Sequence, residues 1–293
     1  MNKAAQAIKT IGVFGKYRDR GIGDVLLGVC QFLKHRQLTV LLEEATAANI
    51  GATDAPRKTM ADIGASIDLA LVFGGDGTLL NVARNLMRYQ VPLVGVNVGR
   101  VGFLADISTD NMLKVIGDIL DGKFQTEERF LLEADIERDG VIVHRANAFN
   151  DVVVNKGELA RLIEFETYID GDFVNDARAD GIIVATPTGS TAYALSAGGP
   201  ILHPTLPAIV LVPICPHTLS LRPLAINATC EIEIVLRDQQ TAHVTFDGQS
   251  TYSLFYGDRV KVRRAHPPVT LIHPVNRNHF EILRTKLHWG RRL

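Results

Sequence analysis

The sequence has few cysteines and no long apolar run. Its cysteines, Cys30, Cys215 and Cys230, are odd in number and scattered, which supports neither a disulfide framework nor a zinc site. No stretch approaches the roughly 18 apolar residues that a membrane-spanning helix needs, and the first residues lack the apolar core of a signal peptide. We therefore expect a cytoplasmic protein.

The chain also carries almost no net charge. Its 31 lysines and arginines against 32 aspartates and glutamates give a net charge of −1, which argues against nucleic acid as the main partner and against a membrane-surface role. Neither a Walker loop nor a Gly-x-Gly-x-x-Gly fingerprint occurs, which disfavours P-loop ATPases and Rossmann dehydrogenases. A content of 46% hydrophobic and 22% charged residues over 293 residues instead predicts a folded protein of two domains.

The first part of the chain alternates apolar runs with helical patterns. Strands are expected at residues 11–14, 38–42, 69–73 and 92–96, and the apolar spacing over 112–120 predicts an amphipathic helix. This alternation predicts an α/β, Rossmann-like N-terminal domain with a parallel sheet over residues 1–126. Ligands of such sheets bind beyond the carboxyl ends of the strands.

From about residue 130 the pattern changes to short strands separated by turns. Asp139-Gly140 and Asp170-Gly171 each stand between two strand-like runs, as in β-hairpins. The pattern predicts an all-β, sandwich-like C-terminal domain over residues 127–265. Residues 278–287 have a helical pattern again, so we expect the tail 266–293 to pack back on the α/β domain.

A glycine-rich loop ends the expected strand at 69–73. It consists of Gly74, Gly75, Asp76, Gly77 and Thr78. Glycines let backbone N–H groups approach a ligand, and a helix starting near Thr78 would point its positive end the same way, so phosphate is the expected ligand of Gly74, Gly75, Gly77 and Thr78. Asp76 can accept the proton of an attacking hydroxyl or hold that hydroxyl in line. An ordinary strand-to-helix turn with a structural aspartate is the alternative.

A second motif runs from Thr186 to Pro200. It combines hydroxyl groups, a glycine at position 189 where the backbone can approach a ligand, and a helix start. Together these features suit the phosphates and ribose of a nucleotide.

The two motifs together resemble those of the NAD kinase family. Gly-Gly-Asp-Gly-Thr alone resembles a loop shared with diacylglycerol and sphingosine kinases and with phosphofructokinases, but these lack the Thr-Gly-Ser-Thr-Ala-Tyr segment at 188–193. The resemblance is to bacterial NAD kinases and covers nearly the whole chain. It implies transfer of the terminal phosphoryl group of ATP to the 2′-hydroxyl of the adenosine ribose of NAD, giving NADP and ADP. It also implies a homo-oligomer, a dimer or tetramer.

The resemblance further implies a divalent metal, Mg²⁺, carried on the nucleotide phosphates without a dedicated cage of protein ligands. It assigns the catalytic carboxylate to Asp76 and the NAD contacts to residues of both domains: Asp76, Gly77, Asn150, Asp151, Arg161, Arg178, Asp180, Thr191, Ala192, Tyr193, Ala194, Leu195, Ser196 and Gln249. The chain departs from the family at Asn150-Asp151, because the family usually pairs Asn with Glu. The carboxylate here stands on a side chain one methylene shorter.

Alternatives remain open from the residues alone. Asn150-Asp151 is also a common turn pair, Arg178 and Asp180 also suit a surface ion pair, and Tyr193 can stack on a base or fill the core. A lipid or small-alcohol kinase would share the Asp76 loop but not need the segment at 188–193. A non-enzymatic dinucleotide-binding regulator would need that segment but not the Asp76 carboxylate.

Overall fold

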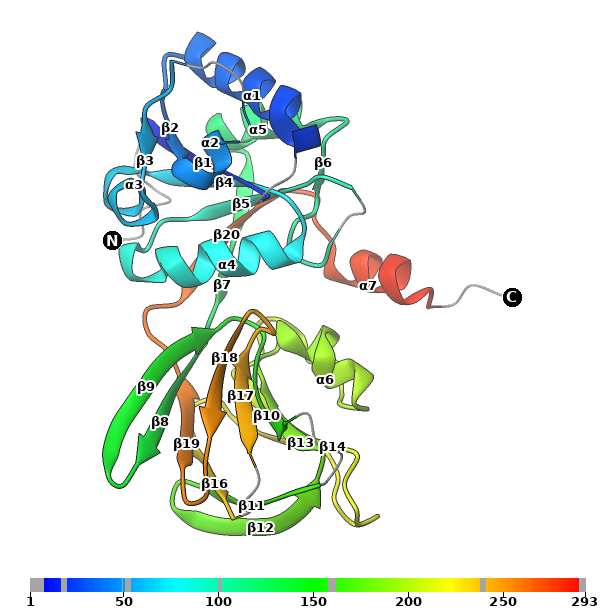
Figure 1. The fold of residues 1–293 in the computed structure, drawn as a ribbon. Helices are drawn as coiled ribbons and strands as arrows, with labels where there is room; N and C mark the ends of the chain where they lie inside the picture. Colours follow the sequence, from blue (N-terminus) through cyan, green and yellow to red (C-terminus); the bar gives the residue numbers. More distant parts are fainter. Residues whose placement is uncertain are drawn as a thin grey trace. The chain divides into compact units, whose positions relative to one another are not determined.

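The chain folds into two compact units. The structure, a computed structural model, describes residues 8–16, 20–48, 50, 54–99, 102–157, 162–237 and 241–289. The first unit comprises Met1–Glu128 together with Val269–Leu293, and the second comprises Arg129–Pro268 (Figure 1). The chain therefore leaves the first unit once and returns to it for its last strand and helix.

The first unit is built on a sheet with strand order β3-β2-β1-β4-β5-β20-β7, with β6 paired to β5. The pairs β1–β2, β2–β3, β1–β4, β4–β5, β5–β20 and β5–β6 are parallel. The strand bounds are β1 Thr10–Gly15, β2 Thr39–Glu43, β3 Arg57–Lys58, β4 Leu69–Phe73, β5 Leu93–Asn97, β6 Ile107–Ser108, β7 Phe124–Arg129 and β20 Val269–Pro274.

Helices cover both faces of this sheet. The helices of this unit are α1 Gly23–His35, α2 Glu44–Ala47, α3 Met60–Ser66, α4 Asp76–Leu86, α5 Met112–Leu120 and α7 His279–Leu287, with short 3₁₀ helices η2 Arg20–Ile22 and η3 Met87–Tyr89. α1 and α5 lie on one face, where Val29 and Ile116 share a buried cluster with Ile11 and Val13, and α3 packs on α4 on the other (Figure 1). This arrangement confirms the predicted α/β domain with a parallel sheet.

Gly95 of β5 brings two segments close to the sheet. A Cβ at this position would lie 2.6 Å from Cδ1 of Leu79 in α4 and 2.8 Å from Cα of Ala105. Because real Cβ atoms do not approach other atoms so closely, only glycine permits this packing. The start of α4 and the segment around Ala105 are thereby held against the same strand.

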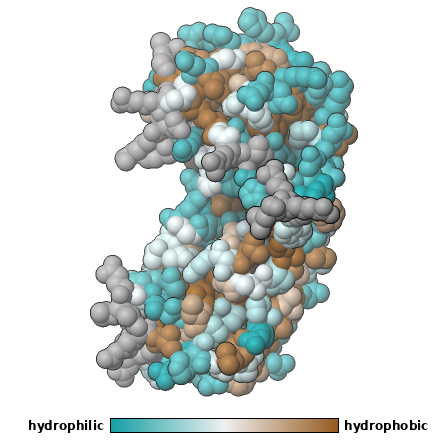
Figure 2. Space-filling model, turned by 90° about the vertical axis from the view of Figure 1, so that its right-hand side faces the viewer, coloured by the Kyte–Doolittle hydropathy of each residue, from teal (hydrophilic) through white to brown (hydrophobic). Residues whose placement is uncertain are grey.

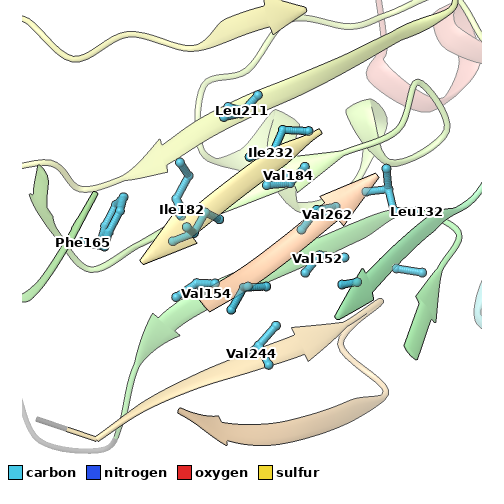
Figure 3. Packing of buried hydrophobic residues seen from close by; sticks show 14 of the residues in the cluster. Leu132, Val152, Val154, Phe165, Ile182, Val184, Leu211, Ile232, Val244 and Val262 are labelled. Carbon is cyan, nitrogen blue, oxygen red and sulfur yellow. The ribbon is translucent and has the colours of Figure 1, made fainter. Parts of the chain in front are cut away.

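The second unit is a sandwich of two antiparallel sheets. Their strand orders are β15-β14-β13-β10-β17-β18 and β12-β11-β16-β19-β8-β9. The bounds are β8 Leu132–Arg138, β9 Val141–Ala148, β10 Asp151–Lys156, β11 Ile163–Ile169, β12 Asp172–Ala179, β13 Gly181–Ala185, β14 Ala208–Ile214, β15 Leu224–Asn227, β16 Ile232–Leu236, β17 Ala242–Phe246, β18 Ser250–Leu254 and β19 Arg259–Arg264, with η4 Gly189–Thr191 and α6 Tyr193–Ser196. Alternate residues of both sheets point inward, among them Val152, Val184, Ile232 and Val262 (Figure 3). The predicted all-β, sandwich-like domain is confirmed.

Asp-Gly pairs close the hairpins as predicted from the sequence. Asp139 and Gly140 have φ of 51° and 77°, and Asp170 and Gly171 have φ of 51° and 87°. Two successive positive φ values are those of a type I′ turn, whose twist matches that of the paired strands. A third pair, Asp247 and Gly248, has φ of 52° and 62° and lies between β17 and β18.

On the face shown in Figure 2, hydrophilic and hydrophobic residues are interspersed on both units. Among the described residues, no helix combines the length and apolar character needed to cross a membrane.

Candidate active site

The glycine-rich loop joins β4 to α4. Gly75 is the N-cap and the helix begins at Asp76, two residues before the predicted start. A Cβ on Gly74 would lie 2.5 Å from Oγ1 of Thr78, so this glycine is needed for the turn itself, whereas nothing lies within 4 Å of a Cβ on Gly75. Gly77 is exposed, and Thr78 is half-buried. The open side of the loop is thus at Gly75 and Gly77.

Three backbone amides hold the carboxylate of Asp76. Oδ2 accepts from the N–H of Phe103 at 2.8 Å, and Oδ1 accepts from the N–H groups of Leu104 at 3.0 Å and Ala105 at 3.1 Å. A Cβ on Gly102 would lie 2.0 Å from Oδ1, so the segment can come this close only with glycine there. A carboxylate oxygen has two lone pairs. Oδ2, with one bond from the described residues, can still accept a bond from a hydroxyl.

In the second unit, three strand ends meet at one edge of a sheet. Asp151 at the start of β10 pairs with Ala185 at the end of β13, and Val152 pairs with Phe246 at the end of β17. The second motif begins at this edge, where the Thr186 hydroxyl donates to the carbonyl of Phe149 at 2.7 Å. The motif, the Asn150-Asp151 pair and the turn at 247–249 therefore lie together.

Packing within the second unit requires a glycine at position 189, which the sequence alone did not indicate. We expected this glycine to let the backbone approach a ligand. A Cβ here would instead lie 2.1 Å from the carbonyl oxygen of Asn150, within the same unit. Its N–H donates to the Thr186 hydroxyl at 3.1 Å, so η4 packs directly on Asn150.

The side chains of the second motif point in different directions. The Ser190 hydroxyl is buried and donates to the carbonyl of Pro187 at 2.6 Å, while Thr191 donates to the carbonyl of Thr188 at 3.2 Å. Ala194 is fully buried in a hydrophobic cluster, but Tyr193 is 45% exposed. Tyr193 therefore does not fill the core. Ala192 and Leu195 are half-buried, and Ser196 is exposed.

Asp247 organises the segment that contains Asp151. Its carboxylate accepts from the N–H groups of Phe149 at 3.0 Å, Asn150 at 2.7 Å and Asp151 at 3.2 Å. Asp151 itself is 4% exposed. Burial, and secondarily the negative charge of Asp247, raise the pKa of Asp151 to about 7.

The remaining predicted contacts are distributed over the second unit. Gln249 lies in the turn next to Asp247, where its N–H donates to the carbonyl of Phe246 at 2.9 Å. Arg178 is paired with Glu164 at 3.0 Å and Asp180 with Lys156 at 2.7 Å, so the two do not pair with each other. The backbone N–H of Lys156 donates to the carbonyl of Asp180. Lys156 is five residues from Asp151 along β10, and at about 3.3 Å per residue this places Asp180 roughly 16 Å from Asp151. Arg161 lies outside the described residues.

No group of three or more His, Cys, Asp or Glu side chains in the described parts of the chain is arranged to hold a metal ion.

Each of the two units matches a domain of one known protein family. The ATP-NAD kinase N-terminal domain matches residues 11–124, and the ATP-NAD kinase C-terminal domain matches residues 149–274. The chain belongs to the ATP-NAD kinase family. It is 49% identical to the NAD kinase of Thiobacillus denitrificans, over 97% of this chain and 98% of the relative, and 48% identical to that of Chromohalobacter salexigens, over 98% and 99%. The family assigned from the two motifs is thus confirmed.

Solved structures share the fold of this NAD kinase family member. Yeast NADH kinase complexed with NADH has a TM-score of 0.89 at 24% identity, covering 99% of this chain and 90% of that chain. An NAD kinase from Archaeoglobus fulgidus in complex with ATP has a TM-score of 0.76 at 26% identity, covering 95% of this chain and 98% of that chain.

Sequence reasoning missed the groups that hold the candidate residues in place. These are the amides of residues 103–105, which leave no side-chain signal, and the carboxylate of Asp247. For Asp247 a signal existed, because an Asp-Gly pair follows the expected strand at 243–246, as at the two hairpins that were predicted.

The raised pKa of Asp151 predicts a pH-dependent stability. An unfolded aspartate has a pKa of about 4, so the neutral carboxyl of the folded state contributes stability that is fully present below about pH 4 and is lost as the pH rises to about 7. Asp151→Asn, which stays neutral, should therefore gain stability relative to the unmodified protein between about pH 4 and pH 8, seen as a growing difference in the urea concentration of unfolding. The exposed Asp172→Asn is the control. Equal behaviour of the two variants across this pH range would contradict the assignment.

Proposed function

We propose that the chain is an NAD kinase, which transfers the terminal phosphoryl group of ATP to the 2′-hydroxyl of the adenosine ribose of NAD and yields NADP and ADP. The observation that carries this conclusion is the match of one family to both units, 11–124 and 149–274. The test is direct: the protein is incubated with ATP, magnesium and NAD, and NADP is followed with a coupled NADP-specific dehydrogenase. The family assignment predicts NADP formation that requires both nucleotides.

Asp76 is the proposed catalytic carboxylate. Phosphoryl transfer requires mainly positioning and neutralisation of charge, and the three amides hold Asp76 in one orientation. Its Oδ2 can accept the hydrogen bond of the ribose hydroxyl, either to orient that hydroxyl or to take its proton. We further propose that phosphates bind at the loop of Gly74, Gly75, Gly77 and Thr78, because the N-terminus of the 11-residue helix α4 favours anions.

A divalent cation, most simply Mg²⁺, is the proposed cofactor. The loop supplies backbone N–H groups and one carboxylate, Asp76, which suits a hydrated Mg²⁺ that is bound chiefly through substrate phosphates. When bound, the cation would neutralise charge on the transferred phosphoryl group. We propose Asp76 as the residue of this loop that would interact with it.

The NAD contacts are proposed for the residues that the family resemblance assigns. In the second unit, Asn150 and Asp151 offer an amide and a carboxyl to ribose hydroxyls, and the exposed ring of Tyr193 is available for stacking. The full proposed set is Asp76, Gly77, Asn150, Asp151, Arg161, Arg178, Asp180, Thr191, Ala192, Tyr193, Ala194, Leu195, Ser196 and Gln249. Because the Ala194 side chain is buried in a hydrophobic cluster, its contribution would come from the backbone.

Asp76→Asn should remove most NADP formation, because the amide keeps the size of the side chain but not its charge, and its Nδ2 cannot accept one of the backbone N–H groups that hold the carboxylate. A general base typically contributes about 10²–10⁴ in rate. The measurement is kcat in the coupled assay, with the melting temperature as a control for folding. A rate within a few-fold of the unmodified protein would reject a catalytic role for Asp76.

Asp151→Ala should raise the KM for NAD, because it removes the carboxyl that would bond a ribose hydroxyl, and a typical hydrogen bond contributes a net of about 0.5–1.5 kcal/mol. Asp151→Glu tests the departure from the family: a site adapted to the shorter, buried side chain should lose activity with the longer one. If Asp151→Ala leaves both KM and kcat unchanged, Asp151 does not contact NAD.

We also propose a cytoplasmic homo-oligomer, a dimer or tetramer. All three cysteines are free, including the exposed Cys215, as is usual in reducing compartments.

The edge strand β9 exposes Val141 at 63% and Ile142 at 50%, and an apolar sheet edge is a common pairing surface. Light scattering should give a mass of two or four copies, and Ile142→Lys should lower it. A monomer at micromolar concentration would contradict the proposal.

A further inference from the structure

A buried cluster of charged residues lies in the first unit, outside the glycine-rich loop. Arg277 follows β20, Glu127 lies in β7, and Asp106 precedes β6. Nε of Arg277 donates to Oδ2 of Asp106 at 2.7 Å, and Nη1 donates to Oε2 of Glu127 at 2.8 Å. The Arg277 side chain is only 7% exposed. Residues far apart in the sequence thus converge on one guanidinium.

The third nitrogen of this guanidinium contacts the segment that holds Asp76. Nη2 of Arg277 donates to the carbonyl oxygen of Phe103 at 3.2 Å, and the N–H of the same Phe103 donates to Oδ2 of Asp76 at 2.8 Å. One residue therefore links Arg277 to the candidate catalytic carboxylate. The adjacent Leu104 and Ala105 supply the other two amides.

The geometry requires a guanidinium in particular. Three nitrogens of one planar group each serve a different acceptor: a carboxylate on Asp106, a carboxylate on Glu127 and a backbone carbonyl. The ammonium of lysine is a point charge on a flexible stem and does not reproduce this fork. His273, which is 2% exposed, has Nδ1 at 3.0 Å from Asp106 and Nε2 at 3.4 Å from Glu127, so it packs against the same two carboxylates.

We propose that Arg277 is a positioning residue for the reaction: it fixes the 102–105 segment, and through the three amides of that segment it fixes the orientation of the Asp76 carboxylate. This inference rests on the proposed catalytic role of Asp76. A residue that acts in this way affects the chemical step rather than substrate binding. Placement errors of about 1 Å can cost on the order of 100-fold in rate.

The first test compares Arg277→Lys and Arg277→Met with Arg36→Met. Arg36 also bonds a carboxylate through two nitrogens, with Nη1 at 2.7 Å from Oδ1 of Asp121 in the same unit, but it has no bond to residues 102–105. Both Arg277 variants should lower kcat about 10- to 100-fold and leave the KM values for NAD and ATP within about twofold. Arg36→Met should leave kcat unchanged.

Arg277→Lys separates activity from folding. Lysine retains a positive charge beside Asp106 and Glu127, so this variant should melt near the unmodified protein even if Arg277→Met does not fold. Its kcat should nevertheless fall, because the bond to the Phe103 carbonyl is lost. A normal kcat in a folded Arg277→Lys variant, or a loss that appears only in KM, would overturn the proposal.

A double-mutant cycle tests whether Arg277 acts through Asp76. In the Asp76→Asn background, measured by single turnover at high enzyme concentration, Arg277→Lys should change the residual rate by less than about twofold. The same fold-loss in both backgrounds would show that Arg277 acts elsewhere. If Asp76→Asn itself keeps the full rate, the proposed role of Asp76 fails. If Asp76→Asn is nearly inactive while Arg277→Lys is normal, only the positioning role fails.

Discussion

The three hydrogen bonds between the Asp76 carboxylate and the amides of residues 103–105 are the contacts on which the first unit's site depends. They join the start of α4 to a segment 27 to 29 residues further along the chain. Two glycines make the contact possible, since a side chain on Gly102 would meet the carboxylate and one on Gly95 would meet Ala105. Hydrogen bonds to a charged group are typically worth about 1.5–3 kcal/mol each. The carboxylate is therefore oriented before any substrate binds.

The second unit uses the same device with the roles reversed. Asp247 accepts bonds from three amide N–H groups of residues 149–151, so here the carboxylate holds the segment, whereas in the first unit the segment holds the carboxylate of Asp76. The candidate side chains are those of the segment itself, Asn150 and Asp151. In both units, hydrogen bonds between one aspartate carboxylate and three consecutive backbone amides fix the region at the end of a strand. Backbone groups therefore set the positions of the candidate side chains.

This reliance on backbone explains which features the sequence predicted. Local patterns were sufficient for the Gly-Gly-Asp-Gly loop, for the helix at Met112–Leu120 and for the Asp139-Gly140 and Asp170-Gly171 turns. Contacts between distant segments leave no such pattern. A return of the tail to the α/β domain was expected, but its strand β20 was not, because β20 pairs with β5 through Leu271 and Leu93, which are 178 residues apart. Gly189 resembled a ligand-binding glycine because a close approach to Asn150 and a close approach to a phosphate require the same missing Cβ.

The departure at Asp151 is consistent with this arrangement. A short side chain keeps its carboxyl close to the backbone, where it is 4% exposed and within reach of the charge on Asp247, and its pKa rises to about 7. A neutral carboxyl can donate one hydrogen bond as well as accept others, whereas an ionised one only accepts. Glutamate, which the resemblance to NAD kinases leads one to expect at this position, would place the carboxyl one methylene further from the strand. Aspartate therefore shortens the reach of the group, and its burial lets the carboxyl donate as well as accept hydrogen bonds near neutral pH.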